Sequence, residues 1–254
     1  MKTCFVVPYY LRTARDEYML KRLIDSAAIQ VQPFAAIIAV DDASPNLLNC
    51  SRENIIYIRI GTNSGPAKAR NAGMEKALEL GCSHILFSDH DCVLSRDWSL
   101  KMTSFMARTS AQAVGGFTLA LGQTLIDKFH DANGTLNGRY ILPERKRLLY
   151  APTCNFAISR EVAELFQFDT KYRKAAGEDV DYCLRIGRIF PIGFCEEAVV
   201  YHDFGYKNAV SGMPRLVNMF EKYKEANALL YASFTEYFSN SWFDSEPIYL
   251  KSKK

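Results

Sequence analysis

Short runs of apolar residues alternate with amphipathic stretches along the N-terminal part of the chain. The runs are continuously apolar, as buried strands are, and between them apolar residues recur at helical spacing. We predict strands at residues 4–7, 35–40, 55–60 and 84–87, and helices at residues 18–29 and 67–80. The first strand is expected to end at Pro8. Strands of this kind, alternating with helices, are typical of a mostly parallel sheet covered on both faces.

The pattern is less regular in the C-terminal part. We predict strands at residues 113–118, 155–159 and 198–201, the last strand of the chain, and helices at residues 162–166, 180–188 and 214–238. We expect Gly115 and Gly116 to interrupt their strand, and the polar residues 120–150 to form a long, partly mobile segment. The predicted fold class is α/β, with a Rossmann-like, mostly parallel sheet flanked by helices and a C-terminal helical extension.

Polar and aromatic residues follow three of the predicted strands. Pro8 and Tyr10 come after the first strand, residues 41–44 after the second and residues 89–91 after the fourth. Ligands of open α/β sheets bind beyond the carboxyl ends of the strands. We therefore expect these side chains to converge on one site.

The Asp-His-Asp sequence at residues 89–91 is a candidate metal site. Two carboxylates this close repel each other unless a cation joins them, and oxygen ligands suit Mn²⁺ or Mg²⁺. The ordinary alternative is a solvated acidic strand end. His90 points to the opposite face if the segment is extended, so we do not expect it to be a ligand.

Two further stretches fit an anionic nucleotide. Asp41 or Asp42 can accept a hydrogen bond from a nucleobase, although a local turn or a helix cap explains them as well. A glycine-containing turn leads into the helix at 67–80, with Lys68 and Arg70 in its first turns, and helix N-termini and basic side chains both favour anions. The stretch lacks the phosphate-loop pattern, which excludes a kinase or ATPase of that type.

Composition and charge narrow the class of protein. The chain has 254 residues, of which 48% are hydrophobic and 23% charged, as in soluble globular proteins. A net charge of +3 is too small to indicate nucleic-acid binding, which usually requires a clustered basic face. The seven cysteines are scattered, and we expect reduced thiols in a cytoplasmic protein. The sequence shows no signal peptide or transmembrane segment, so at most a peripheral contact with the membrane is expected.

Five motifs in order resemble the GT-A fold of family 2 glycosyltransferases. They are a strand followed by Pro-Tyr-Tyr, Val-Asp-Asp-Ala-Ser at 40–44, Asn-x-Gly-x-x-x-Ala-Arg-Asn-x-Gly at 63–73, Asp-x-Asp at 89–91 and Gly-Glu-Asp at 177–179. The last is similar to the Glu-Asp box that opens a helix in that family. The resemblance extends to His202 and covers about four-fifths of the chain.

The resemblance implies a site for a nucleotide-sugar donor. Asp42, or its neighbour Asp41, is implied to contact the base. Pro8 and Tyr10 are implied to line the base pocket. Arg70 lies in the Ala-Arg-Asn match, which the family tends to place on the nucleotide side of the site.

The resemblance also implies metal ligands and a catalytic base. Asp91 is implied to ligate the cation directly, with Asp89 facing the ribose or a metal-bound water and His202 as a further ligand. Asp179, with Glu178 beside it, matches the base, which an inverting transfer needs to remove the acceptor proton. Without the resemblance, helix capping would be the simpler explanation of the Glu-Asp pair, and local hydrogen bonds explain the histidine equally well.

The predicted function is inverting transfer of a sugar from a nucleotide-diphosphate donor to an acceptor hydroxyl or other nucleophile. Family frequency and the Asp41-Asp42 match favour a UDP-sugar, with GDP- and dTDP-sugars as the next candidates. The acceptor stays open between a glycan, a lipid-linked sugar, a peptide and a small natural product. We expect a GT-A domain at residues 1–204, with a nucleotide-sugar half at 1–95 and an acceptor half at 96–204, and a helical extension at 205–254, through which the chain forms a homodimer or completes its core. The alternatives are a sugar nucleotidyltransferase and a non-catalytic nucleotide-sugar-binding protein.

Overall fold

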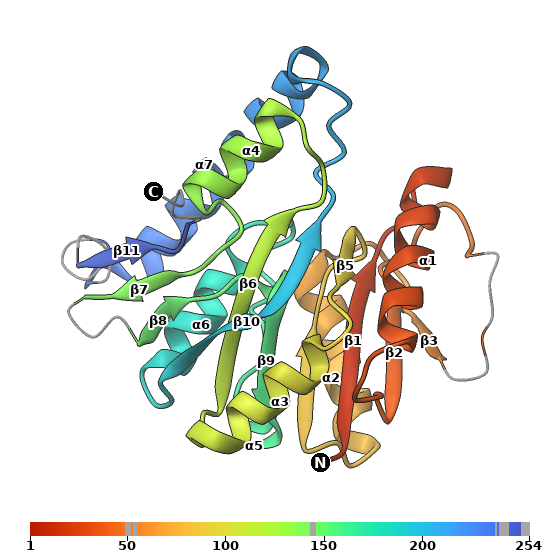
Figure 1. Cartoon of the computed structure of the whole chain (residues 1–254), viewed down its shortest axis with the longest axis vertical. Coiled ribbons are helices and arrows are strands. Elements are labelled where there is room, and N and C mark those ends of the chain that lie inside the picture. Colours follow the sequence, from red (N-terminus) through yellow and green to blue (C-terminus); the bar gives the residue numbers. More distant parts are fainter. Residues whose placement is uncertain (49–51, 53–54, 143–145, 237, 239–243, 250–254) are drawn as a thin grey trace.

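The computed structural model describes residues 1–48, 52, 55–142, 146–236, 238 and 244–249 (Figure 1). The N-terminal part contains β1 (Thr3–Tyr9), α1 (Ala14–Ala28), β2 (Ala36–Asp41), β3 (Ile55–Arg59), α2 (Pro66–Glu79) and β4 (His84–Phe87). Each strand and helix predicted for this part is confirmed, with small shifts at the ends.

β1 does not end at Pro8, as predicted, but continues to Tyr9. The amide of Ser88 donates to the carbonyl of Val6, so this residue of β1 faces β4, and Pro8 has the same orientation because strand residues alternate. The register with β4 stops at Val6. At the position of Pro8 the sheet needs no backbone N–H donor, so proline is tolerated there.

The second part contains more regular structure than predicted. Its elements are β5 (Cys92–Leu94), α3 (Trp98–Thr109), β6 (Ala113–Ala120), α4 (Leu125–Asn133), β7 (Arg139–Ile141), β8 (Arg147–Tyr150), the 3₁₀ turn η1 (Thr153–Asn155), β9 (Phe156–Ser159), α5 (Arg160–Leu165), α6 (Glu178–Gly187), β10 (Ile192–His202), α7 (Ala209–Ser233) and β11 (Ser245–Pro247). The expectation of a long irregular segment at 120–150 is wrong, because α4, β7 and β8 lie there. The expectation that residues 198–201 form the last strand is also wrong: they belong to the longer β10, and β11 follows.

Two sequence signals in this part were misread. Thr124 accepts a hydrogen bond from the amide of Asp127, and the carboxylate of Asp127 accepts one from the amide of Thr124, which caps α4 at its start. Gly116 does not interrupt β6. A Cβ atom there would collide with Asn155 and with the carbonyl of Ala198, so glycine allows the strand to pack closely instead.

The strands of the described chain form one mixed sheet. Its order is β11-β7-β8-β10-β6-β9-β4-β1-β2-β3, with β5 paired to β10. β3, β2, β1 and β4 run parallel, as do β6 and β10. The antiparallel strand β9 joins these two groups, and antiparallel β7, β8 and β11 form one edge. The parallel core with its flanking helices confirms the α/β fold class (Figure 1).

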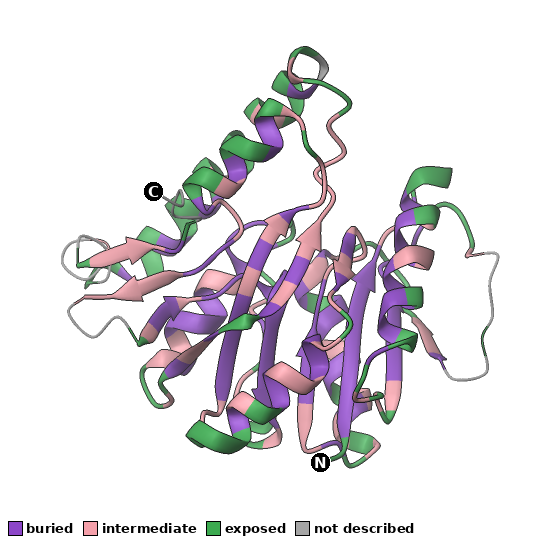
Figure 2. Cartoon of the chain, viewed as in Figure 1, coloured by how far each residue is buried: buried purple, intermediate pink, exposed green. Residues whose placement is uncertain are grey.

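The sheet has a hydrophobic core on each face. Successive residues of β1 alternate between the two: Phe5 packs in one cluster with α1 and α3, and Val6 packs in the other with α2 and α6. Burial is accordingly concentrated in the strands and the inner helix faces (Figure 2). This buried sheet is the rigid support for the loops at its carboxyl edge.

α7 starts at Ala209 and ends at Ser233, whereas the prediction was 214–238. Pro214 lies inside the helix rather than at its start. Leu230 and Phe234 pack against residues of β8 and α6 in a third cluster. The C-terminal residues therefore contribute both a helix and a strand to the fold.

The expectation that all cysteines are reduced thiols is wrong for one pair. Cys4 and Cys82 form a disulfide, with a Cα–Cα distance of 6.0 Å. The pair is brought together because β1 and β4 are parallel neighbours and both residues lie near the strand starts. Cys50 lies outside the described residues, and the other cysteines are buried and free. The disulfide weakens the cysteine-based reason for a cytoplasmic location, which stays a prediction.

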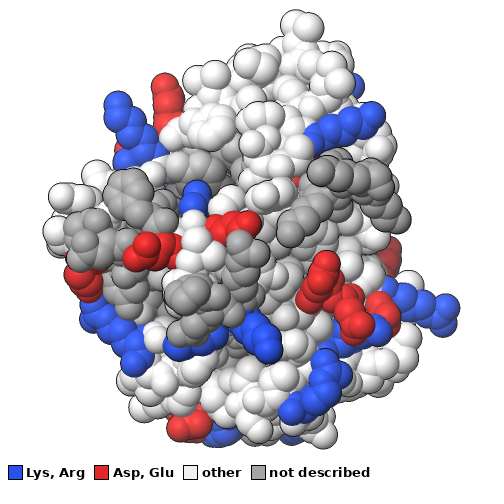
Figure 3. Space-filling view, turned by 60° about the vertical axis from the view of Figure 1, so that its left-hand side comes forward, with Lys and Arg blue, Asp and Glu red and all other residues white. Residues whose placement is uncertain are grey.

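Neither the charge on the face shown in Figure 3 nor the helices of the described residues indicate a nucleic-acid-binding face or a membrane span. Acidic and basic side chains are interspersed on the face shown in Figure 3. No helix among the described residues is both long enough and apolar enough to cross a membrane.

Candidate active site

The predicted site residues lie at one edge of the sheet. β10 runs in the same direction as β4, because β6 and β4 are both antiparallel to β9 and β10 is parallel to β6. The carboxyl ends of β2, β4 and β10 therefore point the same way, which brings Asp41, residues 89–91 and His202 to this edge. The N-terminus of α6 reaches the same edge through Glu178, which contacts Arg70.

Asp41 ends β2 and stabilises the turn that follows. Its Oδ1 accepts hydrogen bonds from the amide and the hydroxyl of Ser44, and its Oδ2 accepts one from Nη1 of Arg59 at 2.6 Å. Arg59 also donates to the carbonyl of Ser44. Both oxygens therefore have partners within the protein, as the local-turn interpretation requires, and a contact with a base stays a prediction.

Asp42 fastens the end of β2 to the loop that opens α2. Its carboxylate oxygens accept hydrogen bonds from the amides of Ser64 and Gly65, both at 2.8 Å, and from Nδ2 of Asn63 at 3.1 Å. Burial raises the pKa of Asp42, and the two amides oppose that shift. The carboxylate positions the loop, and its contact with a base also stays a prediction.

Pro8 and Tyr10 lie next to this loop system. Pro8 is buried within β1 opposite Val40 of β2. Tyr10 directly follows β1 and is partly exposed. Their predicted role in a base pocket stays a prediction.

Arg70 joins two elements that are far apart in the sequence. Its Nη1 donates to Oε1 of Glu178 at 2.8 Å, and its Nη2 donates to Oδ1 of Asp89 at 2.7 Å. Its guanidinium also lies over the ring of Phe168, 5.6 Å from the centroid. Only 3% of the Arg70 side chain is exposed. Arg70 therefore links the N-terminus of α6 to the end of β4.

Asp179 follows Glu178 in the first turn of α6 and is partly exposed. Its surroundings raise its pKa from 3.8 to about 7. The main cause is burial of the carboxyl among protein atoms, and the charge of Glu178 adds to it, while Arg70 and the amide of Val180 oppose it. Such a carboxyl is a stronger base than an ordinary aspartate and is still about half ionised at neutral pH.

Residues 89–92 form a turn. The amide of Cys92 donates to the carbonyl of Asp89 at 3.0 Å, and β5 begins directly afterwards. The segment is therefore not extended, as the argument about His90 assumed. His90 is nevertheless outside the group of possible metal ligands found among the described residues.

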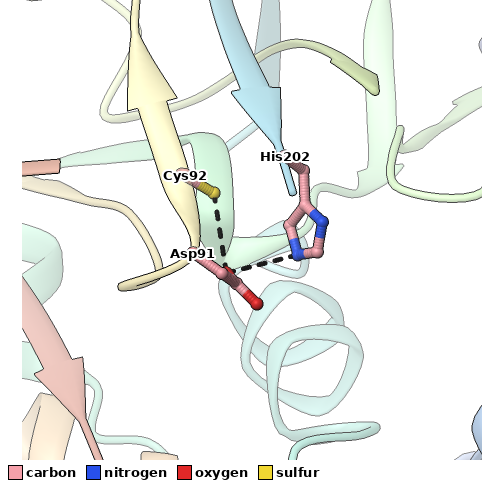
Figure 4. A group of neighbouring side chains, drawn as sticks. All are labelled: Asp91, Cys92 and His202. Carbon is pink, nitrogen blue, oxygen red and sulfur yellow. Dashed lines mark hydrogen bonds and ion pairs between the residues drawn. The ribbon is translucent and has the colours of Figure 1, made fainter. Parts of the chain in front are cut away.

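Asp91, Cys92 and His202 form that group (Figure 4). Nε2 of His202 lies 3.3 Å from Oδ1 of Asp91, and the second oxygen of Asp91 points away from both neighbours. A carboxylate and an imidazole are suitable ligands for Mn²⁺. Burial raises the pKa of the Cys92 thiol well above its ordinary value. Asp89 faces Arg70 instead.

Several residues at the site escaped the sequence analysis. Asp203 binds Nη2 of Arg15 and of Arg22, both at 2.9 Å, which ties the chain after His202 to α1. The charge of Asp179 contributes to a raised pKa at Tyr150 of β8 and at Tyr223 of α7, after burial as the main cause. The charges of these tyrosines and of the carboxyl therefore interact across the site. No local motif marks contacts between residues so distant in sequence.

The model of a family described as "Glycosyl transferase family 2" matches residues 4–166. A search of curated protein sequences found no match.

Solved structures share the fold. S. aureus TarS 1–349 has a TM-score of 0.63 and 19% identity, over 80% of this chain and 61% of that chain. The same TarS segment in complex with UDP-GlcNAc has a TM-score of 0.62 and 18% identity, over 80% and 58%. GalNAc-T7 with UDP, GalNAc and Mn²⁺ has a TM-score of 0.63 and 16% identity, over 80% and 44%. This chain thus spans about three-fifths or less of these proteins, and identities this low indicate a common fold only.

Proposed function

Because the chain belongs to glycosyl transferase family 2, we propose that it moves a sugar from a UDP-sugar to an acceptor hydroxyl with inversion at the anomeric carbon. One observation carries this proposal. The contacts from Asp89 through Arg70 to Glu178 bring Asp179 of α6 to the edge of the sheet where Asp91 and His202 lie. A basic carboxyl beside a group of possible metal ligands is the arrangement that such a transfer requires.

Asp179 is the proposed base. It takes the proton of the acceptor hydroxyl as the oxygen attacks the anomeric carbon from the face opposite the leaving diphosphate. A base works best when its pKa lies near the working pH, and a value of about 7 meets that condition. Glu178 does not take this role, because it is only 5% exposed and is paired with Arg70.

Asp91 and His202 are the proposed ligands of Mn²⁺ or Mg²⁺. Asp91 offers an oxygen that points away from its protein neighbours, and Nε2 of His202 lies beside the other oxygen. Nδ1 of His202 is buried without a hydrogen-bond partner among the described residues, which leaves the tautomer free to place its lone pair on Nε2. When bound, the cation supplies Lewis-acid stabilisation of the charge on the diphosphate. The GalNAc-T7 structure is one with Mn²⁺.

The proposed donor nucleotide is UDP. The structures of TarS with UDP and with UDP-GlcNAc support this choice, since they share the fold. We place the base against the β1 and β2 ends, near Tyr10 and Asp42. The acceptor is proposed to approach from the side of α6, β8 and α7, where the charge of Asp179 acts on Tyr150 and Tyr223.

A second copy of the chain is proposed to pack on α7. Five apolar side chains along the helix are at least half exposed: Val210, Met213, Val217, Phe220 and Tyr231, the first four at intervals of three or four residues. We keep the proposed division into a GT-A domain at 1–204 and an extension at 205–254. Light scattering of the protein in solution checks the homodimer, which should have twice the mass of the chain.

Thermal unfolding with a panel of nucleotide sugars tests the proposed function. A ligand that binds the native state raises the free energy of unfolding, by about 2.7 kcal/mol at a concentration of 100 times Kd, and so raises the midpoint temperature. We expect UDP-sugars with Mn²⁺ to raise the midpoint, and CMP-sugars to leave it unchanged. A midpoint that no nucleotide sugar moves would refute the proposal. Binding without any turnover would favour the non-catalytic alternative.

A further inference from the structure

Arg70 is inaccessible to a donor in this structure. Its side chain is 3% exposed, and each of its two terminal nitrogens already donates to a carboxylate, one of Glu178 and one of Asp89. Phe168 covers one face of the guanidinium. A donor phosphate could reach the guanidinium only by displacing these partners. The predicted role of Arg70 on the nucleotide side of the site is therefore not what the geometry favours.

The partners of Arg70 come from two separate elements. Glu178 is the first residue of α6 and Asp89 follows β4, while Arg70 itself lies in α2. The guanidinium is planar and can hold two carboxylates in fixed directions at once. Asp179 comes directly after Glu178, and the turn that contains Asp91 starts at Asp89.

We infer that Arg70 is a positioning residue, which holds the α6 N-terminus and its Asp179 at a fixed place relative to the turn at 89–92. This inference rests on the proposed function in one respect, the role of Asp179 as the base. Arg70 acts through Glu178 and Asp89 and does not contact the substrate.

The positive charge of Arg70 is needed because three carboxylates surround it. Asp89, Glu178 and Asp179 lie close enough for their charges to interact. Without Arg70, Glu178 is a buried carboxylate without a counter-ion, and leaving one member of a buried pair is strongly unfavourable. The α6 N-terminus would then move away from β4 or Glu178 would take up a proton. Either change alters the position of Asp179.

Steady-state kinetics of Arg70 variants tests the inference. We expect Arg70→Met to lower kcat at least 100-fold while KM for the donor changes less than threefold, because the base is displaced and the donor site is not. Arg70→Lys should recover about tenfold of this loss, since an ammonium replaces the charge but cannot hold both carboxylates. Lys76→Met, at the exposed end of the same helix, is the control and should match the wild type.

A double variant separates positioning from folding. Arg70→Met/Glu178→Gln removes both charges of the buried pair, so its thermal midpoint should return towards that of the wild type while kcat stays low. A donor KM that rises more than tenfold with unchanged kcat would mean that Arg70 binds the donor, and unchanged kcat and KM would mean that it has no role in the site. Both results overturn the inference.

Hydrogen exchange makes the inference testable without turnover. In the double variant, the amides of residues 178–181 and of residue 92 should exchange at least tenfold faster than in the wild type, because the link between α6 and the turn is broken. Unchanged exchange there would overturn the inference. If the wild type itself shows no turnover with any donor, the proposed function fails, and hydrogen exchange still decides on the role of Arg70.

Discussion

At the scale of single residues, the raised pKa of Asp179 is the property most directly tied to chemistry. Burial is its main cause and Glu178 the second. The protonated form is inactive as a base, so activity is present above the pKa and lost as the pH falls through it.

We predict that kcat/KM falls about tenfold per pH unit below an apparent pKa of about 7. Glu178→Gln removes a neighbouring negative charge, while Arg70 keeps Asp89 as its partner, so the substitution should shift this limb to lower pH. The pH dependence of kcat/KM for both proteins measures the effect. An acid limb near pH 4 in the wild type would contradict the prediction.

Asp91→Asn should weaken Mn²⁺ binding at least tenfold, because it removes the charged oxygen ligand of the proposed site. Isothermal titration with MnCl₂ measures the affinity directly. Asp97→Asn, at an exposed position before α3, is the matched control and should bind Mn²⁺ as the wild type does. Equal affinity in the two variants would place the cation elsewhere.

Sequence reasoning located most of these residues but not their contacts. The strand-end positions of Asp42, Asp91 and His202 follow from apolar runs that end in polar residues, and the structure brings Asp91 and His202 together. The hydrogen bond from Arg70 to Glu178 could not be predicted, because it depends on how α2 and α6 pack together on one face of the sheet.

At the scale of elements, the start of α6 packs against α7 and against Tyr172. Gly177 caps the helix with a φ of +85°, and a Cβ atom there would lie 2.8 Å from Cβ of Ala226 in α7 and 3.2 Å from Cε1 of Tyr172. The first turn of α6 is therefore packed against α7, and only glycine fits both the backbone conformation and the space.

Gly177→Ala should lower the free energy of unfolding by about 2–4 kcal/mol, from the left-handed conformation and the close contact together. Gly187→Ala at the other end of α6 has nothing within 4 Å of the new atom and should change stability by less than about 1 kcal/mol. Urea unfolding of both variants gives the comparison. Equal free energies of unfolding for the two variants would show that α7 does not pack closely against Gly177.

Elements with continuous apolar runs were predictable and short ones were not. β1, β2 and β4 are buried strands of a parallel sheet and β3 is its partly buried edge strand, and apolar runs are a direct signal for such strands. β7 and β11 are three-residue strands at the sheet edge, and their pairing is set by tertiary contacts rather than by a pattern of residues. α4 carried a usable signal in its Thr-x-x-Asp capping box.

At the scale of the whole molecule, α7 is part of the fold and not an appendage. Leu230 is 1% exposed and packs with Leu149, Tyr172 and Leu184, which belong to or adjoin β8 and α6. The stability of α6 is thereby linked to the C-terminal residues.

Leu230→Ala should lower the free energy of unfolding by about 2–5 kcal/mol, because it opens a cavity in this cluster. Leu229→Ala, one residue earlier and 43% exposed, should cost less than about 0.5 kcal/mol. Thermal or urea unfolding distinguishes the two. Similar costs would mean that α7 does not dock as described.

The measurement that tests the central claim most directly is the release of UDP from UDP-sugars in the presence of Mn²⁺, with water as the acceptor. The wild type should release UDP slowly, and Asp179→Asn should release it at least 100-fold more slowly while its thermal midpoint still rises with UDP and Mn²⁺. Equal rates for the two proteins would contradict the role of Asp179 as the base. No release from any nucleotide sugar by the wild type would contradict glycosyl transfer by this site.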